Sequence, residues 1–150
     1  MSLFRKKEIF TEEEKQLIIN AIQQAEHRTS GEVRVFVESR CRYVDAIDRA
    51  VEIFQQLKMD QTEFHNAVLV YVAIRDRQLA IYGDEGIHKK VGDRYWANEV
   101  MKMITAFNRD NCAEGIAQCV KDIGEALRVN FPYDRDTDKN ELPDDIVFGK

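Results

Sequence analysis

The chain is 150 residues long, 44% hydrophobic and 33% charged, with a formal net charge of -5. This length is typical of one domain and is enough to bury a core without disulfides or structural metals. The negative charge argues against nucleic acid and anionic membranes as partners, since both are bound through basic surfaces. Cations, basic proteins and small molecules are left as candidate partners.

The cysteines and the termini bear on where the protein works. Cys41, Cys112 and Cys119 are too widely spaced to predict a disulfide framework or a zinc site, and we interpret them as core or boundary residues. No apolar stretch of signal-peptide length follows the N-terminus, and no run approaches the roughly 20 apolar residues that span a bilayer. We therefore expect a cytoplasmic location and no membrane insertion.

Local spacing predicts helices and strands along the chain. Helices are indicated by apolar residues that recur every three or four positions after a polar cap. Strands are indicated by alternating or continuous runs of β-branched residues. In chain order the sequence predicts a helix from a capping box at Thr11–Glu14 to about Thr29, a strand over 32–39, a helix from Asp45 to Leu57, a buried strand over 67–73, a strand over 78–82, a short helix over 87–91, a helix opened by 92–93 that includes Phe107, and a helix over 112–130.

The last segment, 133–150, is polar and acidic. We interpret it as an extended tail that lies on the domain or is partly disordered, and that offers a docking segment for a protein partner. Asp134, Asp136 and Asp138 resemble the opening of an EF-hand loop. However, Lys139 stands where such a loop requires glycine, so a solvated acidic tail is the favoured interpretation.

The order of the elements predicts an α/β fold with helices on both faces of a small mixed sheet. A right-handed crossover should make the strands 32–39 and 67–73 parallel, and the polar turn before 78–82 should make a hairpin. The start of the first strand, the start of the second and the end of the third would then meet at one edge of the sheet.

Carboxylates are concentrated at this edge. Glu32, Asp84, Glu85 and Asp93 are predicted there, with Asn66 beside them. Clustered carboxylates repel one another unless they are solvated, paired with bases or bound to a cation, and oxygen donors of this kind suit Ca²⁺ or Mg²⁺ better than zinc. Purely structural roles remain open: Glu32 can pair with a base, Asp84 can accept backbone N–H groups after its strand, and Asp93 can cap a helix.

Three segments, Thr29–Val35, Asn66–Ala73 and Ile81–Ile87, resemble the core of the TPM domain family, and the resemblance extends over about 10–132. It implies a single domain, 1–150, with a three-layer α/β/α sandwich, and divalent-cation binding, often of calcium. Acid phosphatase activity has been attributed to a chloroplast member. One departure is His65-Asn66-Ala67, where the family commonly has Arg-Asn-Gly; the missing arginine removes a contact for phosphate.

Two functional hypotheses follow. The first is a cation-binding TPM domain with a regulatory or scaffolding role, in which Glu32, Asp84 and Asp93 supply oxygens to calcium rather than magnesium, and Glu85 and Asn66 support them. The second is a metal-dependent acid phosphatase acting on phosphomonoesters, whose remaining phosphate charge is neutralised by a nearby base: Lys89, Lys90 or Arg94.

Overall fold

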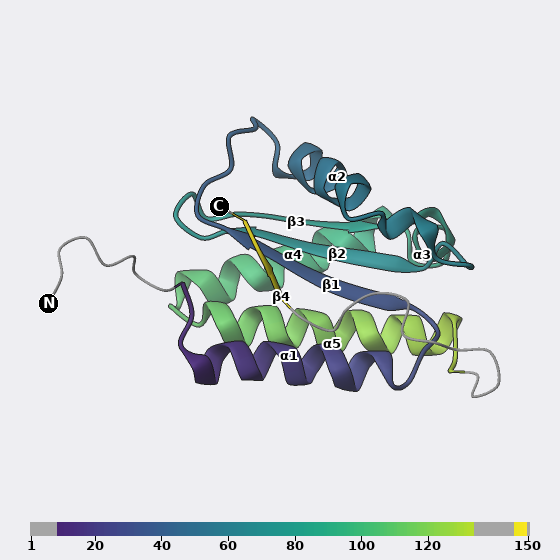
Figure 1. Cartoon of the computed structure of the whole chain (residues 1–150). Helices are drawn as coiled ribbons and strands as arrows, with labels where there is room; N and C mark the ends of the chain where they lie inside the picture. The colour runs from purple at the N-terminus through teal and green to yellow at the C-terminus, as the bar shows by residue number, and fades with distance from the viewer. Residues whose placement is uncertain (1–8, 134–145, 150) are drawn as a thin grey trace, which may run out of the picture.

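The computed structural model describes residues 9–133 and 146–149, which form three layers (Figure 1). A mixed sheet lies in the middle, α2 covers one face, and α1, α4 and α5 cover the other. This is the α/β/α arrangement that the sequence predicts. The elements are α1 (Glu12–Glu26), β1 (Glu32–Glu38), α2 (Ala46–Gln56), the 3₁₀ helix η1 (Met59–Gln61), β2 (Ala67–Ala73), β3 (Gln78–Gly83), α3 (Glu85–Val91), α4 (Asp93–Asn108), α5 (Cys112–Asn130) and β4 (Ile146–Phe148).

The sheet has the strand order β3-β2-β1-β4. β1 and β2 are parallel, with Glu32 opposite Ala67, and β2 and β3 are antiparallel, with Val68 opposite Gly83. The predicted crossover and hairpin are both present. β4 belongs to the predicted tail, which was expected to lie on the domain or to be partly disordered: Ile146–Phe148 lies on the domain and pairs parallel with β1. Three residues are too few for an alternating pattern to predict a strand. The acidic positions 134, 136 and 138 and most of the predicted docking segment lie outside the described residues.

The sheet separates two apolar cores, and β2 is buried along its whole length. Valines at alternate positions of β1 and β2 face the layer of α1, α4 and α5. Leu69 and Tyr71 on the opposite face of β2 pack with Ile53 and Phe54 of α2. Side chains alternate between the two faces of a strand, so a continuous apolar run serves both cores at once.

The turn between α1 and β1 fixes one edge of the sheet against the end of α5. The predicted capping box is present at the start of α1, where Glu14 N lies 3.1 Å from Thr11 Oγ1. α1 ends at Glu26, earlier than predicted, and leaves Thr29 buried in the turn. The Thr29 hydroxyl donates to Leu127 O at 3.1 Å and accepts from Gly31 N at 3.0 Å. These bonds hold the start of β1 in place.

Candidate functional site

Backbone hydrogen bonds join the three chain segments that were expected to meet. Glu32 N lies 3.3 Å from Asn66 O, which links the start of β1 to the start of β2. Asp84 N lies 2.9 Å from Ala67 O, which links the end of β3 to β2. Glu32, Asn66 and Asp84 therefore sit on neighbouring strands at one edge of the sheet, the edge at the right of Figure 1.

Asn66 is the most unusual polar residue at this edge. Its side chain is fully buried, and its Nδ2 donates to Ser30 Oγ at 3.3 Å. Its Oδ1 is buried and has no hydrogen-bond partner among the residues that the structure describes. A buried carbonyl oxygen without a donor costs about 1–3 kcal/mol in lost solvation. Such an oxygen is suited to accept a ligand that carries positive charge.

The two carboxylate oxygens of Asp84 make different contacts, one with the backbone of α3 and one with a side chain at the surface. It is the N-cap of α3, and its Oδ1 accepts from Glu85 N at 2.8 Å, which is the structural role left open for it. Its Oδ2 instead lies 3.3 Å from Nδ1 of His65, whose side chain is half exposed. One carboxylate oxygen thus caps the helix, and the other faces an imidazole at the surface.

The loop before β2 is held tightly against α3. His65 has a φ of 50°, and its carbonyl accepts from Ile87 N at 3.3 Å. A Cβ added at Gly86 would lie 2.1 Å from Phe64 O, so only glycine allows this approach. The glycine therefore positions His65 beside Asp84.

The other predicted ligands lie differently. Glu32 is buried, whereas Glu85 is exposed in the first turn of α3. Asp93 is not a helix cap, because Gly92 is the N-cap of α4; its side chain is 98% exposed and lies 3.4 Å from Nε2 of His88. The seven residues of α3 separate it from Asp84, about 10 Å along the helix axis. Within 9–133 and 146–149, no three His, Cys, Asp or Glu side chains are grouped closely enough to hold a metal by themselves.

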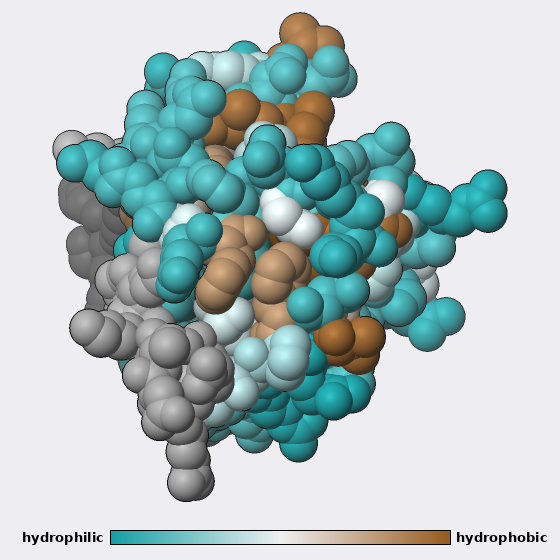
Figure 2. All heavy atoms as spheres, turned by 90° about the vertical axis from the view of Figure 1, so that its right-hand side faces the viewer, coloured by the Kyte–Doolittle hydropathy of each residue, from teal (hydrophilic) through white to brown (hydrophobic). Residues whose placement is uncertain are grey.

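Apolar groups gather in the middle of this face of the molecule, with polar groups around them (Figure 2). Phe64 next to His65 is 48% exposed, and its ring centroid lies 6.4 Å from that of Phe131. The Phe131 carbonyl accepts from Ser30 N at 3.0 Å, so this aromatic pair borders the edge that holds Asn66. The candidate site is therefore flanked by an apolar surface.

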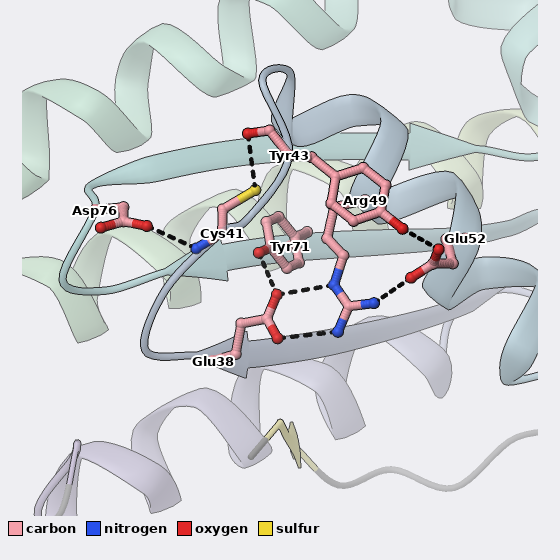
Figure 3. A network of polar contacts seen from close by, with 7 residues as sticks. All are labelled: Glu38, Cys41, Tyr43, Arg49, Glu52, Tyr71 and Asp76. Carbon is pink, nitrogen blue, oxygen red and sulfur yellow. Dashed lines mark hydrogen bonds and ion pairs between the residues drawn. The ribbon is translucent and has the colours of Figure 1, made fainter.

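The opposite edge of the sheet carries a polar network that sequence reasoning missed (Figure 3). Arg49 of α2 binds Glu38 with two hydrogen bonds, Nε to Oε2 at 2.9 Å and Nη2 to Oε1 at 3.0 Å. The Tyr71 hydroxyl also donates to Glu38, and burial together with this bond raises the pKa of Tyr71. Arg49 bonds Glu52 as well. All four carboxylate oxygens of Glu38 and Glu52 accept a hydrogen bond from Arg49, Tyr43 or Tyr71, so we interpret this network as a structural lock between β1, β2 and α2.

The cysteines are where the sequence placed them. Cys41 and Cys119 are buried, and Cys112 is half-buried. Burial raises the pKa of Cys112 to about 12 and raises the pKa of Cys119 above its usual range. The thiolate is the form that binds metals and attacks substrates, so these two thiols are poorly suited to either task.

The fold and this edge define an α/β/α domain with a mixed sheet, whose candidate site lies where the parallel strands begin. The sequence model of the TPM domain matches residues 3–126, and the chain belongs to that family. It is similar to the NMR structure of the BA42 protein from the psychrophilic bacterium Bizionia argentinensis, at 39% identity and a TM-score of 0.87, over 97% of this chain and 99% of that one. None of the curated proteins matches it. No helix in the described ranges is long and apolar enough to cross a membrane.

Proposed function

We propose that this protein binds a divalent cation, calcium in preference to magnesium, at the edge formed by the starts of β1 and β2 and the end of β3. The binding has a regulatory or scaffolding role. The observation that carries the proposal is Asn66 Oδ1, a buried oxygen without a hydrogen-bond partner in the described part of the chain. The Asp84 carboxylate, on the neighbouring strand end, supplies the negative charge.

The donor set favours calcium. Asn66, Asp84 and Glu32 offer amide and carboxylate oxygens from three strand ends. Glu85 is exposed and acts through water, whereas Asp93 lies about 10 Å along α3 from Asp84 and adds only negative charge at a distance. Calcium accepts six to eight oxygens, including amide oxygens and waters, in flexible geometry. Magnesium requires a near-ideal octahedron and releases its waters reluctantly. Too few carboxylates are grouped here to enforce such an octahedron.

Calcium binding is tested by calorimetry and thermal unfolding with CaCl₂ and MgCl₂. We expect heat and a raised Tm with calcium, since a ligand at 100 times its Kd stabilises the folded state by about 2.7 kcal/mol. Asp84→Asn should abolish both effects. Asparagine still caps a helix, so α3 should remain folded. Glu125→Gln, an exposed change on α5, is the matched control. Absence of heat and of stabilisation in the unaltered protein would refute the proposal.

The phosphatase alternative has one observation in its favour. His65 lies beside Asp84 and is half exposed, so the site contains an imidazole within reach of a bound substrate, a group that general acid–base catalysis commonly uses. If the site is catalytic, the purified protein should hydrolyse p-nitrophenyl phosphate with calcium or magnesium, and both Asp84→Asn and His65→Gln should reduce the rate at least a hundredfold. Equal activity in all three proteins would identify a contaminating enzyme.

A further inference from the structure

A groove lies between α4 and α5, away from the proposed cation site. Its volume is about 310 Å³. Small residues form its floor, because a Cβ at Gly115 would lie 2.6 Å from the Cβ of Ala106. Thr105 and Gln118 also line it, and Lys102 and Asp122 lie at one end.

This end of the groove holds an excess of acid. Glu99 of α4 is only 2% exposed, and its Oε2 accepts from Lys102 Nζ at 2.9 Å. The same ammonium lies 3.2 Å from Asp122 Oδ2 on α5. Glu99 Oε1 is buried, and the Glu99 carboxyl group lies within hydrogen-bonding reach of the Asp122 carboxyl group and of the Cys119 thiol. Two carboxyl groups thus share one ammonium.

The pKa of Glu99 is raised, as expected for a buried carboxyl group next to a second one. Burial raises the pKa of Glu99, and the Asp122 carboxylate raises it further, against the opposing effect of Lys102. Charge-coupled carboxyl groups next to a cleft are typical of binding sites. The Lys102 ammonium, which lies between the two carboxyl groups, offsets the repulsion between them.

We propose that the groove between α4 and α5 binds a small ligand through a primary ammonium group, which Asp122 and Glu99 accept at the position now held by Lys102. Lys102 itself defines the geometry, since its Nζ lies within 3.2 Å of an oxygen of each carboxyl group. The Lys102 side chain is 61% exposed, so its flexible stem can carry the ammonium into solvent when a ligand replaces it.

The rest of the groove combines small and polar side chains with one residue of each charge, Arg109 and Glu114. Ala106 and Gly115 present a flat floor, and Thr105 offers a hydroxyl at the rim. Gln118 Nε2 donates to Asp122 Oδ1 at 3.0 Å, which orients the carboxylate. An organic ammonium fits this position because an ammonium, that of Lys102, already lies between the two carboxyl groups.

The test is an NMR titration of the ¹⁵N-labelled protein with trialanine amide and with N-acetyl-trialanine amide, which differ only at the N-terminus: an ammonium in the first and an uncharged acetylated amide in the second. We expect the backbone amides of Thr105, Gly115 and Gln118 to shift with the first peptide and not with the second. Asp122→Asn should weaken binding at least tenfold, and Lys102→Met should tighten it, because the internal competitor is gone. Glu125→Gln, on the same helix outside the groove, should change nothing.

The same spectra report whether each variant is folded. Equal shifts with the acetylated peptide, an unchanged affinity in folded Asp122→Asn, or no shift at millimolar peptide would each overturn the proposal. Calcium at the other site provides an independent reference: its titration should perturb Asp84 and its neighbours and leave the groove amides in place.

Discussion

Asn66 at the start of β2 and Ser30 just before β1 are joined by their side chains, with Asn66 Nδ2 3.3 Å from Ser30 Oγ. This bond orients the amide so that its oxygen, rather than its nitrogen, remains without a hydrogen-bond partner in the described chain. Ser30 therefore contributes to the candidate cation site by setting the direction of an Asn66 donor.

The first prediction concerns this oxygen. Asn66→Asp places a full negative charge in a buried position, so the calcium-free protein should lose about 2 kcal/mol or more of unfolding free energy. Added calcium should raise the unfolding free energy of Asn66→Asp by more than it raises that of the unaltered protein, because a carboxylate is a stronger calcium ligand than an amide. Urea unfolding with and without CaCl₂ measures both effects. Asn98→Asp, at an exposed position of α4, is the control and should respond to neither.

The second prediction concerns the lock at the opposite edge of the sheet. Arg49→Met leaves the buried Glu38 carboxylate without its two-point partner and should cost about 3 kcal/mol of unfolding free energy. The double variant Arg49→Met/Glu38→Gln should recover much of this loss, since it removes the stranded charge. Chemical denaturation of the two variants measures both losses. Equal losses of unfolding free energy would mean that the unpaired Glu38 carboxylate is not the cause of the destabilisation.

The third prediction concerns pH. The pKa of Glu99 is raised in the folded protein, so over the titration range the folded state binds more protons than the unfolded state. Stability is then lost as the pH rises from the usual carboxyl value of 4.5 through the raised folded value. Glu99→Gln should abolish this loss and make the protein more stable than the unaltered chain at neutral pH. Urea midpoints between pH 4 and pH 8, measured on both proteins, would show parallel profiles if Glu99 were not responsible.

The fourth prediction concerns two glycines around α3: Gly86, where there is no room for a side chain, and Gly92, where the backbone conformation requires glycine. Gly86→Ala forces a methyl group against Phe64 O and should cost about 3 kcal/mol, displacing the loop that carries His65. Gly92→Ala meets no neighbouring atom, but Gly92 has a φ of 79° and a ψ of 171°, a conformation that essentially only glycine adopts, so this loss should be about 1–3 kcal/mol and should come from backbone strain alone. Thermal unfolding gives both losses. Calcium affinity should fall in Gly86→Ala alone, and an equal calcium affinity in the two variants would contradict the steric argument.

Local signals were sufficient for most of the fold. The capping box at Thr11 and the apolar run of β2 depend on neighbours in sequence, and both predictions are confirmed. The edge at which Glu32 and Asp84 lie also followed from strand direction alone. The position of Asp93 was less predictable, because the length and direction of α3 place it on the outside.

Features formed by distant segments escaped prediction. The pair of Glu38 and Arg49 depends on how α2 lies over the sheet, and neither residue stands out in a pattern of spacing. A charged residue at the end of a buried strand, such as Glu38, is the one signal that could have indicated a partner. The contact of Glu99 with Asp122 and Lys102 likewise requires knowing which faces of α4 and α5 meet.

β4 gives the sheet its outer boundary on the side of β1. Its three residues pair with Val35, Phe36 and Val37, and Gly149 N extends the pairing to Val37 O at 2.7 Å. A chain cut before Ile146 would offer β1 as an uncovered edge, on which a strand from another copy can add. The short last strand therefore covers the backbone of β1, and we expect proteolytic removal of 146–149 to promote self-association through this strand.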